Sequence, residues 1–329
     1  MNLITAEALG QKLADSLPVD CRFSLAEPDL GERLYTQGHI PGARYAHLDK
    51  HLSSPITALT GRHPLPDFGA LAEQLGAWGI DADTHVVAYD DQSGFFASRL
   101  WWLLRTMGHN RVSVLDGGIQ TWQAAGLPLS TELPEIRPAP FNASVDHTAW
   151  QDVDALQHCL AEGSCLLIDA RTPERYSGIE EPIDPVAGHI PGALNLPITE
   201  NLDDRGCFLP ASTLRDHYLT LIRDTQPDQV IHFSSQRGSV AAVQSRPAVV
   251  PPSRPATAPS RPVAAPSRPA VAAHSPAIVK LATGTGSIRA ADQTFKPVFE
   301  FWGSNGQSSM IKFAIDGQAF QIAENSNLG

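Results

Sequence analysis

The sequence is poor in cysteine and in basic residues. Its 329 residues include 4 cysteines, with no Cys-x-x-Cys pair and no histidine at the spacing of a zinc site. Lysine and arginine number 24 against 35 aspartate and glutamate, a formal net charge of -11. This charge excludes broad electrostatic binding to nucleic acid or to an anionic membrane. We expect no metal site and four free thiols, Cys21, Cys159, Cys165 and Cys207.

Long apolar runs are also missing. No stretch approaches the roughly 20 apolar residues that a membrane-spanning helix requires. The first 17 residues carry Glu7, Lys12 and Asp15, so they lack the basic start and the unbroken apolar stretch of a signal peptide. We expect a soluble cytoplasmic protein that needs no cofactor.

An internal repeat is the most informative feature that is present. Residues 38–43 and 188–193 both read Gly-His-Ile-Pro-Gly-Ala, 150 positions apart. Residues 86–94 align with 230–238 at nearly the same offset. A repeat this long indicates two duplicated domains, and 42% hydrophobic residues provide apolar material for two cores.

Apolar periodicity predicts alternating strands and helices in both copies. In the first copy we expect strands at 84–89 and 111–115 and helices at 95–107 and 119–125. In the second we expect helices at 150–161 and 213–221 and strands at 165–169 and 229–233. This order is typical of an α/β fold whose parallel sheet is covered on both faces.

The pattern changes after residue 243. Ser-Arg-Pro recurs at 245, 253, 260 and 267, and proline at this density forbids helix interiors and sheet ladders. Asp316-Gly317 between alternating apolar stretches predicts a β-hairpin. We therefore divide the chain into domains at 1–135 and 136–243, a disordered linker at 244–278 and a small β segment at 279–329.

Short motifs in both copies resemble the tandem rhodanese family, the thiosulfate and 3-mercaptopyruvate sulfurtransferases. They include Gly-Arg-His-Pro-Leu-Pro at 61–66, Leu-Asp-Gly-Gly at 115–118 and Asp-Ala-Arg at 169–171, besides the repeated hexapeptide. The resemblance covers about residues 1–233. It implies two tandem rhodanese-like parallel-sheet domains. The second is incomplete, because the proline-rich linker stands where the family has a further strand and two helices.

The resemblance implies a non-catalytic first domain and a second domain with a cysteine after its central strand. In the family this cysteine takes sulfane sulfur from an anionic donor as a persulfide and passes it to cyanide or a thiol. Here Ser234 occupies that position, and a hydroxyl cannot store sulfur in this way. We predict a sulfurtransferase by family, impaired or inactive. The alternative is a non-catalytic scaffold whose β tail is displayed to a protein partner.

The candidate site residues follow from the same resemblance. Arg175 is expected to hold the anionic donor through its planar guanidinium. Arg62, Asp169 and Arg237 are further candidates for the donor site. A structural role is expected for the residues that both copies share, namely His39, His189, Asp20, Gly42 and Gly192.

Overall fold

The computed structural model describes residues 2–57, 60–182, 187–226, 229–233, 313–315 and 318–323. In this part of the chain, helices and strands alternate in two successive copies, each with a five-stranded sheet. The predicted α/β class is confirmed. The linker at 244–278, Ser234 and Arg237 lie outside the described residues.

The first copy contains a parallel sheet in the order β1-β5-β4-β2-β3. Its central pair runs in register from Ser16 opposite His85 to Asp20 opposite Tyr89. Its elements are β1 (Leu3–Ile4), α1 (Ala6–Gln11), β2 (Ser16–Asp20), α2 (Leu30–Gln37), β3 (Arg44–Tyr45), α3 (Leu48–His51), α4 (Phe68–Ala77), β4 (His85–Tyr89), α5 (Ala97–Thr106), β5 (Val112–Leu115) and α6 (Gly118–Ala124).

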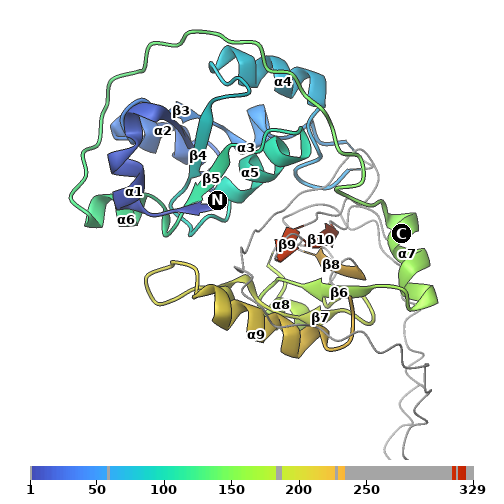
Figure 1. The fold of residues 1–329 in the computed structure, drawn as a ribbon. Coiled ribbons are helices and arrows are strands. Elements are labelled where there is room, and N and C mark those ends of the chain that lie inside the picture. Colours follow the sequence, from blue (N-terminus) through green and yellow to red (C-terminus); the bar gives the residue numbers. More distant parts are fainter. Residues whose placement is uncertain are drawn as a thin grey trace, which may run out of the picture. The chain divides into compact units, whose positions relative to one another are not determined.

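Both faces of the first sheet are buried, as alternation along β4 shows. Val86 and Ala88 pack in the cluster that contains residues of α4 and α5. Val87 and Tyr89 pack in the cluster that contains residues of α1, α2 and α6. Figure 1 shows these helices on the two sides of the strands. Successive side chains of a strand point to opposite faces of the sheet, so a layer of helices is required on each face of the first sheet.

The segment between the two copies, residues 125–152, forms hydrogen bonds to the first copy at several points along its length. Ser130 exchanges two backbone hydrogen bonds with His39, and the Ala139 amide donates to the Gly76 carbonyl at 2.9 Å. The Asp146 amide donates to the Thr106 carbonyl at 2.8 Å. Figure 1 shows this segment in green between α6 and α7. These bonds satisfy backbone groups that a free linker would leave to water.

The second sheet has the order β7-β6-β8-β10-β9. β6 lies between β7 and β8 just as β2 lies between β3 and β4, and all these pairs are parallel. The elements of this copy and the tail are α7 (Val153–Glu162), β6 (Leu166–Asp169), α8 (Pro173–Ser177), β7 (Leu194–Asn195), α9 (Ala211–Ile222), β8 (Val230–Phe233), β9 (Phe313–Ile315) and β10 (Gln318–Ala323).

The tail contributes a strand to the second sheet. β10 pairs parallel with β8, with Gln321 opposite Ile231, and antiparallel with β9. The antiparallel pairing predicted for the tail is confirmed. β10 has the place beside β8 that β5 has beside β4. Backbone pairing explains this position, because the edge of β8 away from β6 offers N–H and C=O groups to a further strand.

The expectation of four free thiols is wrong for two cysteines. Cys159 and Cys165 form a disulfide with a Cα–Cα distance of 5.5 Å. Gly163 ends α7 in the left-handed region with φ 65°, and the Ser164 amide bonds back to the Cys159 carbonyl. This turn brings Cys165 back beside Cys159 in the last turn of α7. Cys21 and Cys207 are free, as expected.

No helix among the described residues has the length and apolar character needed to cross a bilayer.

Candidate functional site

A buried aspartate–arginine pair lies at the carboxyl end of the second sheet. Asp169 ends β6, and Arg171 donates to its carboxylate from Nε at 3.0 Å and 3.1 Å and from Nη2 at 2.7 Å. Arg171 also donates to the Gly188 carbonyl at 2.6 Å. The pair therefore fixes the start of the Gly-His-Ile-Pro-Gly-Ala turn. Both carboxylate oxygens of Asp169 accept hydrogen bonds from Arg171.

The first copy contains the same arrangement. Arg22 donates to the Asp20 carboxylate from Nε and Nη2, and to the Gly38 carbonyl at 2.7 Å. Two bonds are added here: the Tyr89 hydroxyl donates to Asp20 at 3.0 Å and accepts from the Ile40 amide at 3.1 Å. In the second copy Phe233 stands opposite Asp169, and phenylalanine has no hydroxyl.

The two repeated histidines make matching contacts. His39 stacks on Tyr35 with ring centroids 4.1 Å apart, and His189 stacks on Tyr176 at 3.7 Å. In each case histidine Nδ1 donates to the carbonyl of the same tyrosine, at 2.8 Å and 2.7 Å. The tyrosine hydroxyls donate in turn to the carbonyls of Ala43 and Ala193. These contacts bind each turn to the helix before it, and the structural role of the two histidines stays a prediction.

The glycines of the two turns adopt left-handed backbone angles. Gly42 has φ 80° and Gly192 has φ 88°. A Cβ at either position would meet nothing within 4 Å. The conformation, rather than crowding, is therefore what favours glycine here.

The loop after β4 shows what occupies the first copy at the position equivalent to Ser234. Asp90 follows Tyr89, and its fully buried carboxylate accepts four backbone N–H bonds, from Gln92, Gly94, Phe96 and Ala97, at 2.6–2.9 Å. A carboxylate thus uses the amides that open α5. No thiol stands there, so the described loop of the first copy has no group that could carry sulfur.

Arg175 distinguishes the second copy from the first. It lies in α8, where the Thr172 hydroxyl caps the helix and Pro173 occupies its first turn. The residue before the stacked tyrosine is Arg175 in this copy and Leu34 in the first. Arg175 is paired with Glu181, whose Oε1 lies 3.0 Å from both Nε and Nη2. The predicted donor-binding guanidinium is thus held by a carboxylate of the chain itself.

Glu181 comes from a segment that the first copy lacks. Two residues separate Tyr35 from Gly38, whereas eleven separate Tyr176 from Gly188. Glu181 also lies 3.4 Å from Nη1 of Arg171, so it joins Arg175 to the aspartate–arginine pair. Sequence reasoning missed both Arg171 and Glu181. The unequal spacing between the repeated tyrosine and glycine is the signal that points to this segment.

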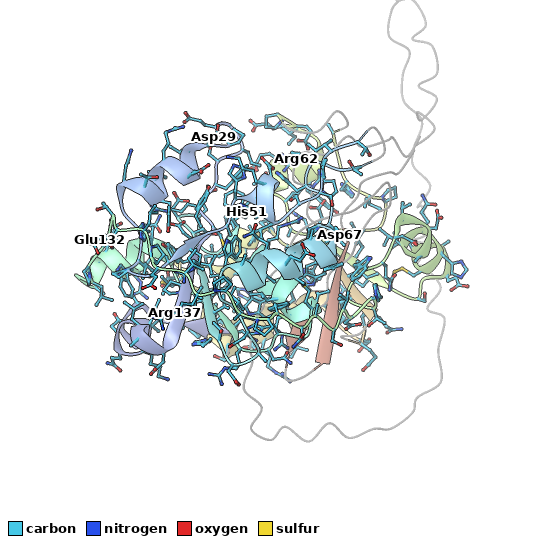
Figure 2. The ribbon with its side chains drawn as sticks, turned by 90° about the horizontal axis from the view of Figure 1, so that it is seen from above. Asp29, His51, Arg62, Asp67, Glu132 and Arg137 are labelled. Carbon is cyan, nitrogen blue, oxygen red and sulfur yellow. A yellow bond between two sulfur atoms is a disulfide. The ribbon has the colours of Figure 1, made fainter. Side chains whose placement is uncertain are left out.

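Arg62 lies in the first copy, in the chain between α3 and α4, and it is one of the residues labelled in Figure 2. Burial lowers the pKa of the neighbouring His63 to about 4, and the positive charges of Arg99 and Arg62 add to this effect. His63 Nε2 lies 3.0 Å from Asp49 Oδ1. The structure therefore places Arg62 beside His63, and its contact with a donor stays a prediction.

The two free cysteines are poor nucleophiles. Burial raises the pKa of the Cys207 thiol, and the carboxylates of Asp116 and Asp203 add to this shift. Burial also raises the pKa of Cys21 well above its ordinary value. Because the thiolate is the reactive form, neither residue is a substitute for the cysteine missing at position 234.

A cavity of about 620 Å³ lies at the opposite edge of the second sheet, where Leu166 and Leu194 begin β6 and β7. Ligands of open α/β sheets bind at the carboxyl ends of the strands. The candidate site is therefore the group of Asp169, Arg171, Arg175 and Glu181. No cluster of three or more metal-ligating side chains occurs among the described residues.

The fold and the repeated aspartate–arginine and histidine–tyrosine contacts define a tandem protein of two related parallel-sheet domains. Comparison with known proteins places the chain in the same class. The model of the rhodanese-like domain matches residues 5–125 and 152–245. The "Probable 3-mercaptopyruvate sulfurtransferase" of Pseudomonas aeruginosa is 44% identical over 235 residues, 70% of this chain and 83% of that protein. Human 3-mercaptopyruvate sulfurtransferase is 37% identical over 188 residues, 54% of this chain and 62% of that protein.

Solved structures show the same likeness. SseA from Escherichia coli superposes with a TM-score of 0.62 and 30% identity, over 72% of this chain and 88% of SseA. The 3-mercaptopyruvate sulfurtransferase from Leishmania major gives 0.64 and 28% identity, over 71% and 66% of the two chains. This chain belongs to the tandem-domain rhodanese-like sulfurtransferase family.

Proposed function

We propose that this chain binds small anionic sulfur donors at Arg175 and that its transfer of sulfane sulfur is impaired. The observation that carries the proposal is the difference between the two copies. They share the aspartate–arginine pair, which contacts the Gly-His-Ile-Pro-Gly-Ala turn in both copies, and the stacked histidine of that turn. Arg175 and its partner belong to the second copy alone, and a planar guanidinium suits the oxygens of thiosulfate or of the carboxylate of 3-mercaptopyruvate.

The impairment follows from Ser234, directly after β8. In a relative with cysteine there, the thiolate attacks the outer sulfur of thiosulfate, the S–S bond breaks, and sulfite leaves with the electron pair. The resulting persulfide then gives its outer sulfur to cyanide or a thiol. A serine hydroxyl has a pKa far above that of a thiol and forms no stable persulfide. Burial raises the pKa of the two free thiols, Cys21 and Cys207, and so disfavours their thiolate forms.

Assays of sulfur transfer from thiosulfate to cyanide and from 3-mercaptopyruvate to a thiol test this proposal. We expect the native chain at the background rate and Ser234→Cys well above it, with Ser234→Ala as the control at background. Equal rates for the native chain and Ser234→Cys would contradict the proposed impairment. No observation favours the alternative of a scaffold that displays its tail, because β10 is paired with β8.

A further inference from the structure

The guanidinium proposed to bind the donor is already occupied within the chain. Glu181 contacts Arg175 in a bidentate manner, with Nε 3.0 Å from Oε1 and 3.2 Å from Oε2, and Nη2 3.0 Å from Oε1. Its side chain is 4% exposed and that of Arg175 is 13% exposed. An ion pair so poorly solvated is little screened by water, so the carboxylate acts strongly on any second anion.

Within the part of the chain that the structure describes, each arginine of the group has a carboxylate partner. Arg171 is neutralised by Asp169, and Arg175 by Glu181. In the first copy, Asp20 and Arg22 balance in the same way, and the uncharged Leu34 replaces Arg175. Among the described residues, this group therefore holds one more positive and one more negative charge in the second copy than in the first. An incoming anion competes with Glu181 for the guanidinium of Arg175.

We infer that Glu181 sets which anions the site accepts: it weakens binding of all anionic donors, and of dianions more than monoanions. The reason is Coulomb's law, since repulsion by one fixed negative charge grows with the charge of the ligand. Thiosulfate carries two negative charges at neutral pH, and an α-keto carboxylate carries one. Glu181 therefore favours the keto-acid class of donor over thiosulfate. This inference rests on the proposed function.

The test is equilibrium binding of two inorganic or unreactive probes, thiosulfate and pyruvate, to the full chain by titration calorimetry. Glu181→Gln keeps the shape of the side chain and one oxygen for Arg175 while it removes the charge. We expect it to bind thiosulfate about tenfold more tightly and pyruvate about threefold more tightly than the native chain, as loss of one nearby negative charge implies. Glu180→Gln is the matched control, because it removes the same charge from an exposed neighbour.

Glu180→Gln should change either affinity by about twofold or less, since exposed charges are screened. Thermal unfolding of each variant shows whether it is folded. Should Glu181→Gln be unfolded, Glu181→Met takes its place. It also removes the charge while it keeps the length of the side chain, so it should likewise bind thiosulfate more tightly than the native chain.

Unchanged or weaker thiosulfate binding in the folded variant would overturn the inference, and so would equal gains for the two probes. A lower unfolding temperature without a change in affinity would also overturn it, because Glu181 would then only support the fold. Arg175→Gln separates this outcome from failure of the proposed function. Native binding that Arg175→Gln abolishes upholds the proposed function even when Glu181 has no effect. Absence of binding to the native chain and all variants would reject both.

Discussion

The two copies of this chain share the buried aspartate–arginine pair but differ in the hydrogen bonds that surround it. In both, an arginine ties the aspartate at the end of a strand to the carbonyl that starts the Gly-His-Ile-Pro-Gly-Ala turn. In the first copy Tyr89 adds a hydroxyl bond to Asp20, and Asp90 fills the following loop with its own carboxylate. In the second copy Phe233 and Ser234 follow. The first copy thus has stabilising contacts at the two positions where the second copy has a phenylalanine and a serine.

The largest expected effect comes from removing the shared aspartate. Asp20→Ala should destabilise the first copy by about 4 kcal/mol, because it leaves the buried Arg22 charge without its partner. Asp169→Ala should cost about 3 kcal/mol in the second copy. The cost is smaller because Asp169 has no hydrogen bond from a tyrosine hydroxyl to lose, whereas Asp20 has one from Tyr89. Hydrogen exchange of the β2 and β6 amides measures the two copies separately. A larger loss for Asp169→Ala would refute this view of the comparison.

Much of this arrangement could be predicted from sequence, because duplication supplied a comparison. The repeated hexapeptide predicted two domains of one fold, and apolar periodicity located β4, β6, α5 and α9 to within a few residues. Local rules sufficed for these features. Glycine at a turn and alternation along a buried strand depend on neighbours in the chain.

The features that sequence missed depend on contacts for which it offered no parallel. Glu181 lies in a segment without a counterpart in the first copy, so no repeat indicated its role. The Cys159–Cys165 disulfide depends on the left-handed turn at Gly163 rather than on a known cysteine motif. The pairing of β10 with β8 joins residues some 90 positions apart, and backbone hydrogen bonding across such a distance leaves no pattern in composition.

Acid should weaken the first copy through His63. Burial holds its pKa at about 4 in the folded chain, against 6.5 as its ordinary value. Between these values the unfolded chain binds more protons than the folded one. Stability is therefore full above pH 6.5 and falls as the pH drops towards 4, by at most about 3 kcal/mol for this residue.

His63→Gln should reduce this loss, since glutamine does not titrate. The measurement is the urea midpoint of the first copy at pH 7.5 and at pH 5, followed by hydrogen exchange of β2 and β4. His232 in the second copy is the internal comparison, because burial lowers its pKa to about 3. The stability of the second copy should therefore keep its dependence on pH in the His63 variant. The same decline with acid in His63→Gln and the native chain would show that His63 is not responsible.

The smallest expected effect is also the sharpest test of the comparison. Tyr89→Phe gives the first copy the residue of the second, and it should cost about 1–2 kcal/mol, because Asp20 loses one bond and the Ile40 amide loses its acceptor. If the hydroxyl accounts for the difference between the copies, Asp20→Ala in the Tyr89→Phe background should cost the same as Asp169→Ala. The double-mutant cycle over Asp20 and Tyr89 measures this coupling. A coupling energy near zero would mean that Tyr89 stabilises the turn at Ile40 independently of the aspartate.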